Sequence, residues 1–206
     1  AERYTGTVMQ DGHAWSAATG THAELTTLGD GRNSPHLTVM GAGDSPTWSP
    51  EWAAALAGRA VFALKNDPAR PLQTLSLAGV LPATTADRFT QEERNLLLYD
   101  GIATHKVDDG GRVLIERAIT TYQTNAQGVE DRSFLDVTTM KTLAYIRYAV
   151  RARISTRFPR HKLADDGTAF AAGSAVVTPK IIRAELISLM RDLERAALVE
   201  NIEQFK

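Results

Sequence analysis

The sequence predicts an α/β (α+β) fold, with a mixed β-sheet flanked by helices, a β-hairpin at about 102–122 and two long helices in the C-terminal half. Three observations support it. Helical and strand-like stretches alternate over residues 14–122. The turn sequence Asp108-Asp109-Gly110-Gly111 separates two strand-like stretches. Two segments with helical apolar periodicity then follow.

Composition excludes several classes of protein. The 206 residues carry a net charge of −1, are 43% hydrophobic and include no cysteine. Disulfide scaffolds, thiolate nucleophiles and Cys-based metal sites are therefore excluded. The apolar runs are too short to span a bilayer. The chain begins with Ala1 and shows no signal-peptide pattern, so we expect a fragment or a processed chain.

The first elements are a helix and a strand. The Ala- and Thr-rich stretch from Trp15 to Leu28 predicts a helix that ends at Gly29-Asp30-Gly31. A turn at Asn33-Ser34-Pro35 then leads into a predicted strand at residues 36–41.

Caps and prolines delimit the elements that follow. Ser49-Pro50-Glu51 predicts a helix with Ser49 at the N-cap, which ends before Asn66-Asp67-Pro68 because proline disfavours helix in the residue before it. Residues 72–77 predict a strand. The sequence Thr90-Gln91-Glu92-Glu93 is a capping box that opens a short helix ending near Gly101.

The second half combines the hairpin with long helices. Residues 102–107 and 112–122 are the predicted hairpin strands, and a polar loop follows at 123–135. Asp136 is expected to cap a helix over 137–157, and Pro179 to start a final helix that ends near Leu198. A loop at 163–175 and a short strand at 176–178 lie between them. We expect one compact domain over 1–206, with a possible sub-boundary near 123–135.

Charge is distributed unevenly along the chain. Residues 1–136 carry 11 basic and 17 acidic groups, whereas residues 137–162 carry seven basic groups and no acidic one. Such a basic segment either binds acidic surfaces of other copies or folds against carboxylates of its own chain. We take it as a candidate subunit interface, formed by Lys141, Arg147, Arg151, Arg153, Arg157, Arg160 and Lys162.

Helical geometry places several of these arginines beside apolar residues. At about 100° per residue, Met140, Leu143, Ile146, Val150 and Ile154 form one apolar stripe, and four arginines lie within or beside it. Arginines there can lay their stems on apolar surface and reach carboxylates of a neighbouring element or subunit.

Signals for chemistry are weak. Gly41-Ala42-Gly43-Asp44 lacks the third glycine and the Lys-Ser/Thr of phosphate loops, and the five histidines show no metal-ligand spacing. Asp108-Asp109 and Asp165-Asp166 each precede glycine, as turn residues do. Two alternatives stay open: a metal- or acid/base-dependent hydrolase domain using His161, Asp165 and Asp166, and a nucleic-acid-binding domain using the basic segment 141–162.

Several blocks of sequence resemble one family. Residues 95–122 (NLLLYDGIATHKVDDGGRVLIERAITTY) are similar to the tail sheath protein of Mu-like contractile-tailed bacteriophages and prophages. The stretches 67–75, 159–167 and 177–185 resemble it in the same order, and residues 33–36 do so more weakly.

This resemblance implies a structural protein with no cofactor, metal or active site. Its implied partners are further copies of itself, the tail tube protein, and baseplate and tail terminator proteins, with no nucleic acid or membrane among them. The implied subunits form stacked hexameric rings around the tail tube in the virion, are assembled in the host bacterial cytoplasm, and contract to drive the tube through the host envelope.

The resemblance also implies a role for the final helix. Family members contact the tube through a helix near the C-terminal part of the inner domain, which corresponds here to 179–198. Lys180, Arg183 and Arg191 are then the candidate tube-facing charges. Family members extend beyond both ends of this sequence and add terminal strands to neighbouring subunits. We therefore expect a core without those extensions, which leaves open whether it is monomeric.

Overall fold

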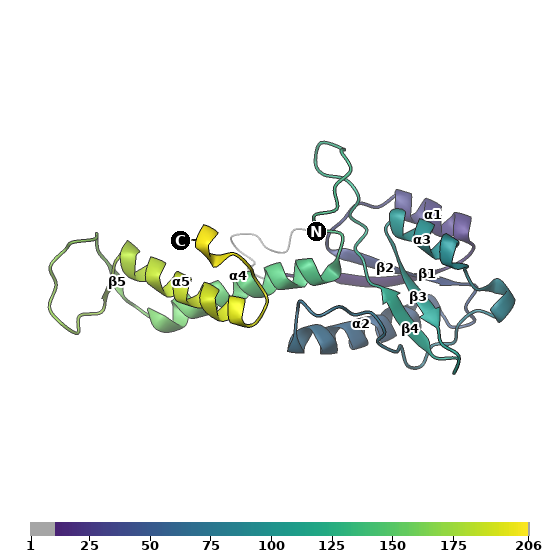
Figure 1. The fold of residues 1–206 in the computed structure, drawn as a ribbon, viewed down its shortest axis with the longest axis horizontal. Helices are drawn as coiled ribbons and strands as arrows, with labels where there is room; N and C mark the ends of the chain where they lie inside the picture. The colour runs from purple at the N-terminus through teal and green to yellow at the C-terminus, as the bar shows by residue number, and fades with distance from the viewer. Residues whose placement is uncertain (1–10, 206) are drawn as a thin grey trace. The chain divides into compact units, whose positions relative to one another are not determined.

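A computed structural model describes residues 11–205, which form two compact units divided between Lys141 and Thr142 (Figure 1). The first contains, in chain order, β1 (Ala14–Thr19), α1 (His22–Asp30), β2 (Leu37–Gly43), α2 (Ser49–Asn66), the 3₁₀ turn η1 (Thr85–Asp87), α3 (Gln91–Tyr99), β3 (Ile102–Val107) and β4 (Val113–Arg117). Helix α4 (Val137–Arg157) begins in this unit and continues into the second.

The first unit is built on a four-stranded sheet in the order β1-β2-β3-β4. The pairs β1–β2 and β2–β3 are parallel, and β3–β4 is the antiparallel hairpin. The fold class predicted from the sequence, a mixed sheet flanked by helices with a hairpin, is therefore confirmed. Strand β4 is shorter than the predicted stretch, since it ends at Arg117.

Helices cover both faces of this sheet, α1 and α3 on one and α2 on the other (Figure 1). Consecutive side chains of a strand point to opposite faces. Met40 accordingly packs with Trp52 of α2. Val39 packs instead with Leu25 of α1 and Leu97 of α3. The sheet is thus the centre of a three-layer unit.

The helices on one face begin with matching capping boxes. Thr90 accepts the amide of Glu93, whose carboxylate accepts the Thr90 amide, as the sequence predicted for α3. Thr21 and Glu24 form the same arrangement at the start of α1.

The predicted helix from Trp15 to Leu28 is wrong in its first half. Residues 14–19 form strand β1, which pairs with β2, and the helix begins only at His22. Gly20, with a φ of 134°, separates the strand from the helix. The capping box of Thr21 and Glu24 then starts α1. The helix ends almost where predicted, at Asp30, with Gly31 as its C-cap.

Two further expectations need correction. Ser49 is the first residue of α2 rather than its cap; the N-cap is Trp48, which makes no side-chain capping bond. Residues 72–77 form no regular strand because Thr74 has a φ of 70°. Their backbone still follows β4, with the Thr74 amide donating to Ile115 and the Leu77 amide to Val113.

The second unit is a pair of helices with a small sheet. It contains the rest of α4, the strands β5 (Lys162–Leu163) and β6 (Val176–Val177), α5 (Pro179–Arg195) and the 3₁₀ turn η2 (Ile202–Gln204). The two strands pair in parallel, and a long loop over residues 164–175 joins them. Both predicted long helices are confirmed, although α5 ends at Arg195 rather than near Leu198. No helix within residues 11–205 is long and apolar enough to cross a membrane.

Candidate functional site

The basic segment folds partly against carboxylates of its own chain. Arg153 of α4 donates to Glu185 at 3.0 Å and to Asp192 at 2.7 Å, both on α5. Arg157 also lies 3.8 Å from the Glu185 carboxylate. The hydrogen bonds from Arg153 to Asp192 and Glu185 raise the pKa of its guanidinium. Intramolecular pairing was one of the two interpretations that the sequence allowed, the other being binding to acidic surfaces of other copies.

The other members of the segment occupy different environments. Lys141 is partly buried, and burial lowers the pKa of its ammonium despite the charge of Asp11. Arg160 and Lys162 are exposed. A nucleic-acid-binding surface needs the seven cations on one exposed face. Arg153 is instead paired with carboxylates and Lys141 is partly buried, so these two do not belong to such a face. The interface role of the segment stays a prediction.

The candidate tube-facing residues lie on one side of α5. Lys180, Arg183 and Arg191 are all exposed. At about 100° per residue, they fall within an arc of about 80°. The helix therefore presents three cations in one direction.

Asp166 and His161, two residues of the hydrolase alternative, make contacts within the second unit. Asp166 accepts the Lys180 amide at 3.1 Å and so ties the long loop to the start of α5. The Thr178 hydroxyl and the Lys180 amide hold the pKa of Asp166 below its usual value. His161 lies 3.1 Å from the Pro159 carbonyl and packs edge-on against Phe158. Among residues 11–205, no group of three or more acidic or histidine side chains could hold a metal ion.

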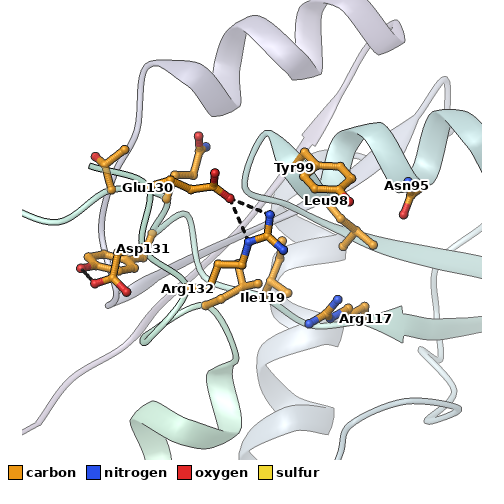
Figure 2. Close-up of a pocket in the computed structure, with 12 residues that line it drawn as sticks. Asn95, Leu98, Tyr99, Arg117, Ile119, Glu130, Asp131 and Arg132 are labelled. Carbon is orange, nitrogen blue, oxygen red and sulfur yellow. Dashed lines mark hydrogen bonds and ion pairs between the residues drawn. The ribbon is translucent and has the colours of Figure 1, made fainter. Parts of the chain in front are cut away.

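One pocket of the first unit has internally paired charges. Figure 2 shows this cavity of about 400 Å³, which lies between α3 and the loop 123–135. Arg132 pairs with Glu130 at 2.6 Å and lies over the ring of Tyr99. Asp131 accepts the Tyr122 hydroxyl. Because these charges already have partners, the pocket presents no obvious site for an ionic ligand.

A second cavity, of about 280 Å³, lies where β2 and β3 end. His105 forms part of its wall, with Nδ1 3.0 Å from the Gly41 carbonyl and its ring 4.7 Å from that of Trp52. Burial lowers the pKa of His105 to about 4, so the ring is neutral near pH 7. No sequence motif marks this cavity, because only the fold brings its residues together.

Two domain families of sheath proteins together match nearly the whole length of the chain. Residues 1–121 match the phage tail sheath protein central domain, and residues 129–206 match the phage tail sheath C-terminal domain. The Mu-like prophage FluMu tail sheath protein of Haemophilus influenzae is 48% identical over 195 residues, which is 95% of this chain and 40% of that protein. The chain thus spans about 40% of the length of this relative.

Solved structures share the fold at low sequence identity. The sheath tail protein of Desulfitobacterium hafniense gives a TM-score of 0.59 at 16% identity, over 90% of this chain and 39% of that one. A chain of the anti-feeding prophage baseplate gives a TM-score of 0.54 at 12% identity, over 80% of this chain and 40% of that one. The two matched domains, supported by the 48% identity, decide the assignment: the chain belongs to the phage tail sheath protein family, a structural and non-enzymatic one.

Proposed function

We propose that this chain is part of a contractile tail sheath subunit, which assembles into stacked hexameric rings around a tail tube and contracts to drive the tube through the host envelope. The observation that carries the proposal is the match to both the central and the C-terminal sheath domain. The chain spans about 40% of its sheath relative, so ring formation and contraction are properties of the longer protein.

The small sheet of the second unit supports assembly by strand addition. Strands β5 and β6 are two residues long each, and Leu163 of β5 is 81% exposed. Two paired strands of this size are marginal by themselves in water. Strands from neighbouring subunits would extend this sheet by main-chain hydrogen bonds, which is β-augmentation.

The proposed partners follow from the sheath role. They are further copies of the chain, the tail tube protein, and baseplate and tail terminator proteins, in a virion tail assembled in the bacterial cytoplasm. A chain from an anti-feeding prophage baseplate shares the fold, which is consistent with a place in such a tail.

The basic segment is proposed to form ion pairs between subunits that change partners on contraction. Arg153 and Arg157 already share Glu185 within the second unit, so an incoming cation or carboxylate competes for an existing pair. Exposed pairs contribute only about 0–1 kcal/mol each, but repetition in every subunit adds their effect. Assembly of the natural-length protein should therefore depend on salt, and salt-independent assembly would argue against this role.

Electron microscopy of the natural-length protein tests the function. Expressed alone and together with its tail tube protein, it should form wide hollow helical tubes, which enclose the thinner tube in the second case. Dispersed subunits under both conditions would refute the proposed function.

A further inference from the structure

A crevice opens in the first unit where two parallel strands separate. Strands β2 and β3 pair at two positions only, Val39 with Ile102 and Met40 with Ala103. Both strands continue beyond these residues. The cavity of about 280 Å³ lies at their carboxyl ends, between Gly43 on one strand and His105 and Lys106 on the other. In open α/β sheets, the crevice outside the carboxyl ends of the strands is where ligands bind.

The wall formed by His105 is fixed and uncharged. Because the Gly41 carbonyl can only accept, Nδ1 carries the proton and donates it. The ring is also held against Trp52, which is buried. His105 therefore shapes the crevice without adding charge to it.

Three cations line the crevice, and one of them is already neutralised. Arg94 donates to both carboxylate oxygens of Glu116, at 2.7 and 3.2 Å, and to the Phe89 carbonyl. These bonds engage each of its guanidinium nitrogens. Arg94 is thus a fixed part of the wall rather than a group available to a ligand.

The other two cations have no acidic partner within residues 11–205. Arg88 donates through Nε to the Ala83 carbonyl at 3.1 Å, and its two terminal nitrogens bond to nothing in that range. Lys106 has no ion-pair or hydrogen-bond partner there for its ammonium. Asp87, the acid that lines the crevice, accepts the Thr84 hydroxyl at 2.5 Å. The crevice therefore keeps an excess of positive charge in an acidic part of the chain.

We propose that this crevice binds a carboxylate, supplied by an aspartate or glutamate side chain of a second copy of the chain. The terminal nitrogens of an arginine match the two oxygens of a carboxylate. Asp87 disfavours a doubly charged group such as phosphate. Residues 1–136 carry 17 acidic against 11 basic groups, so a second copy presents many carboxylates. The identity of the donor rests on the proposed function, whereas the carboxylate chemistry does not.

Exposed apolar side chains near this part of the chain favour a protein as the donor. Trp48 and Leu81 are 69% and 63% exposed, and the Leu81 amide donates to Thr47, the neighbour of Trp48. Leu81 also lies two residues before Ala83, which lines the crevice. Tryptophan and arginine are both enriched at protein interfaces.

Titration of the isolated chain with acetate tests the chemistry without any assembly. Backbone amide resonances of Gly43, Arg88 and Lys106 should shift saturably with acetate, and more weakly with inorganic phosphate at equal ionic strength. Replacing Arg88 by Gln should weaken acetate binding about tenfold, as loss of a hydrogen bond to a charged group does. Lys65→Gln, on the exposed side of α2, is the matched control and should change nothing. Absent shifts, or phosphate binding as tight as acetate, would overturn the carboxylate assignment.

Carbodiimide cross-linking of the assembled natural-length protein tests the donor. In particles mixed from ¹⁴N- and ¹⁵N-labelled subunits, Lys106 should form amide cross-links to acidic residues of another copy, and Arg88→Gln should reduce their yield. Lys65 again serves as the control. Particles in which Lys106 cross-links no more than Lys65 would overturn the second-copy donor while leaving the sheath function intact. Failure to form particles would refute the sheath function and with it the second-copy donor, and the acetate titration would still decide the carboxylate site.

Discussion

At the scale of single residues, the charge of His105 is set by burial. Its ring lies between the Gly41 carbonyl and Trp52, and its pKa is lowered to about 4 from 6.5. The unfolded chain therefore binds a proton at a pH where the folded chain does not. His13, which lies 2.8 Å from the Thr38 hydroxyl, has a pKa lowered by burial to about 3 and adds to the same effect.

The free energy of unfolding should consequently fall as the pH falls through the window between these values. This free energy of unfolding is highest above about pH 6.5 and decreases toward about pH 4. His105 contributes at most about 3 kcal/mol to the decrease, at about 1.4 kcal/mol per pKa unit. Urea unfolding at several pH values measures this decrease. His105→Gln keeps a donor for Gly41 but cannot titrate, so its decrease should be shallower. Equal pH dependence in both proteins would contradict the role of His105.

The sequence predicted where a side chain lies on its helix, but not which residues it contacts. The periodicity of residues 137–157 placed Arg153 beside the apolar stripe, where it can reach a carboxylate of a neighbouring element. It could not identify Glu185 and Asp192, because their proximity depends on how α5 packs against α4. Arg88 and Lys106 were missed for the same reason, since strand separation creates their crevice.

At the scale of elements, contacts between helices and strands decide which glycines are replaceable. An added Cβ at Gly29 of α1 would lie 2.0 Å from the Asp100 carbonyl oxygen, beyond the end of α3. An added Cβ at Gly58 of α2 would meet nothing within 4 Å. Both glycines are helical, so they differ in packing rather than in backbone preference.

Gly29→Ala should therefore destabilise the protein, whereas Gly58→Ala should stabilise it. We expect a loss of about 2 kcal/mol or more for the first, since backbone must move, and a gain of about 0.5–1 kcal/mol for the second. Urea unfolding of the two variants measures both changes. Similar changes in the two would show that α1 does not approach Asp100 as described.

The start of α5 depends on a side chain from a distant loop. Asp166 accepts the Lys180 amide, and this bond holds the loop against the helix. Asp166→Ala should increase hydrogen exchange at the Lys180 amide at least about tenfold, because that amide loses its acceptor. Asp165→Ala is the matched control and should leave the rate unchanged. Equal effects of the two would show that Asp166 does not cap α5.

Two elements with local signals were predicted correctly, whereas two segments whose conformation depends on distant contacts were not. The hairpin turn and the Thr90 capping box act within a few residues, so the sequence identified both. Strand β1 was read as helix because its Ala-rich sequence suits a helix, while its hydrogen bonds go to β2, more than twenty residues later. Residues 72–77 were read as strand because the left-handed Thr74 gives no sequence signal.

At the scale of the whole molecule, the proposed function concerns surfaces that meet other chains. Reversing the charges of Lys180, Arg183 and Arg191 to glutamate together should abolish assembly of sheath around the tail tube protein. The three lie on one exposed side of α5, so the change leaves the buried Leu189 and Leu193 untouched. Lys65→Glu on α2 is the control and should assemble normally. Sheath–tube assembly unaffected by the triple reversal would rule out this side of α5 as the tube contact.

The most direct test of the account is a helical reconstruction, by electron cryomicroscopy, of tubes formed by the natural-length protein. We predict six-fold rings in which the fold of residues 11–205 fits each subunit and strands of neighbouring subunits extend the β5–β6 sheet. Rings in which this sheet remains two-stranded, or protein that forms no tubes at all, would contradict it.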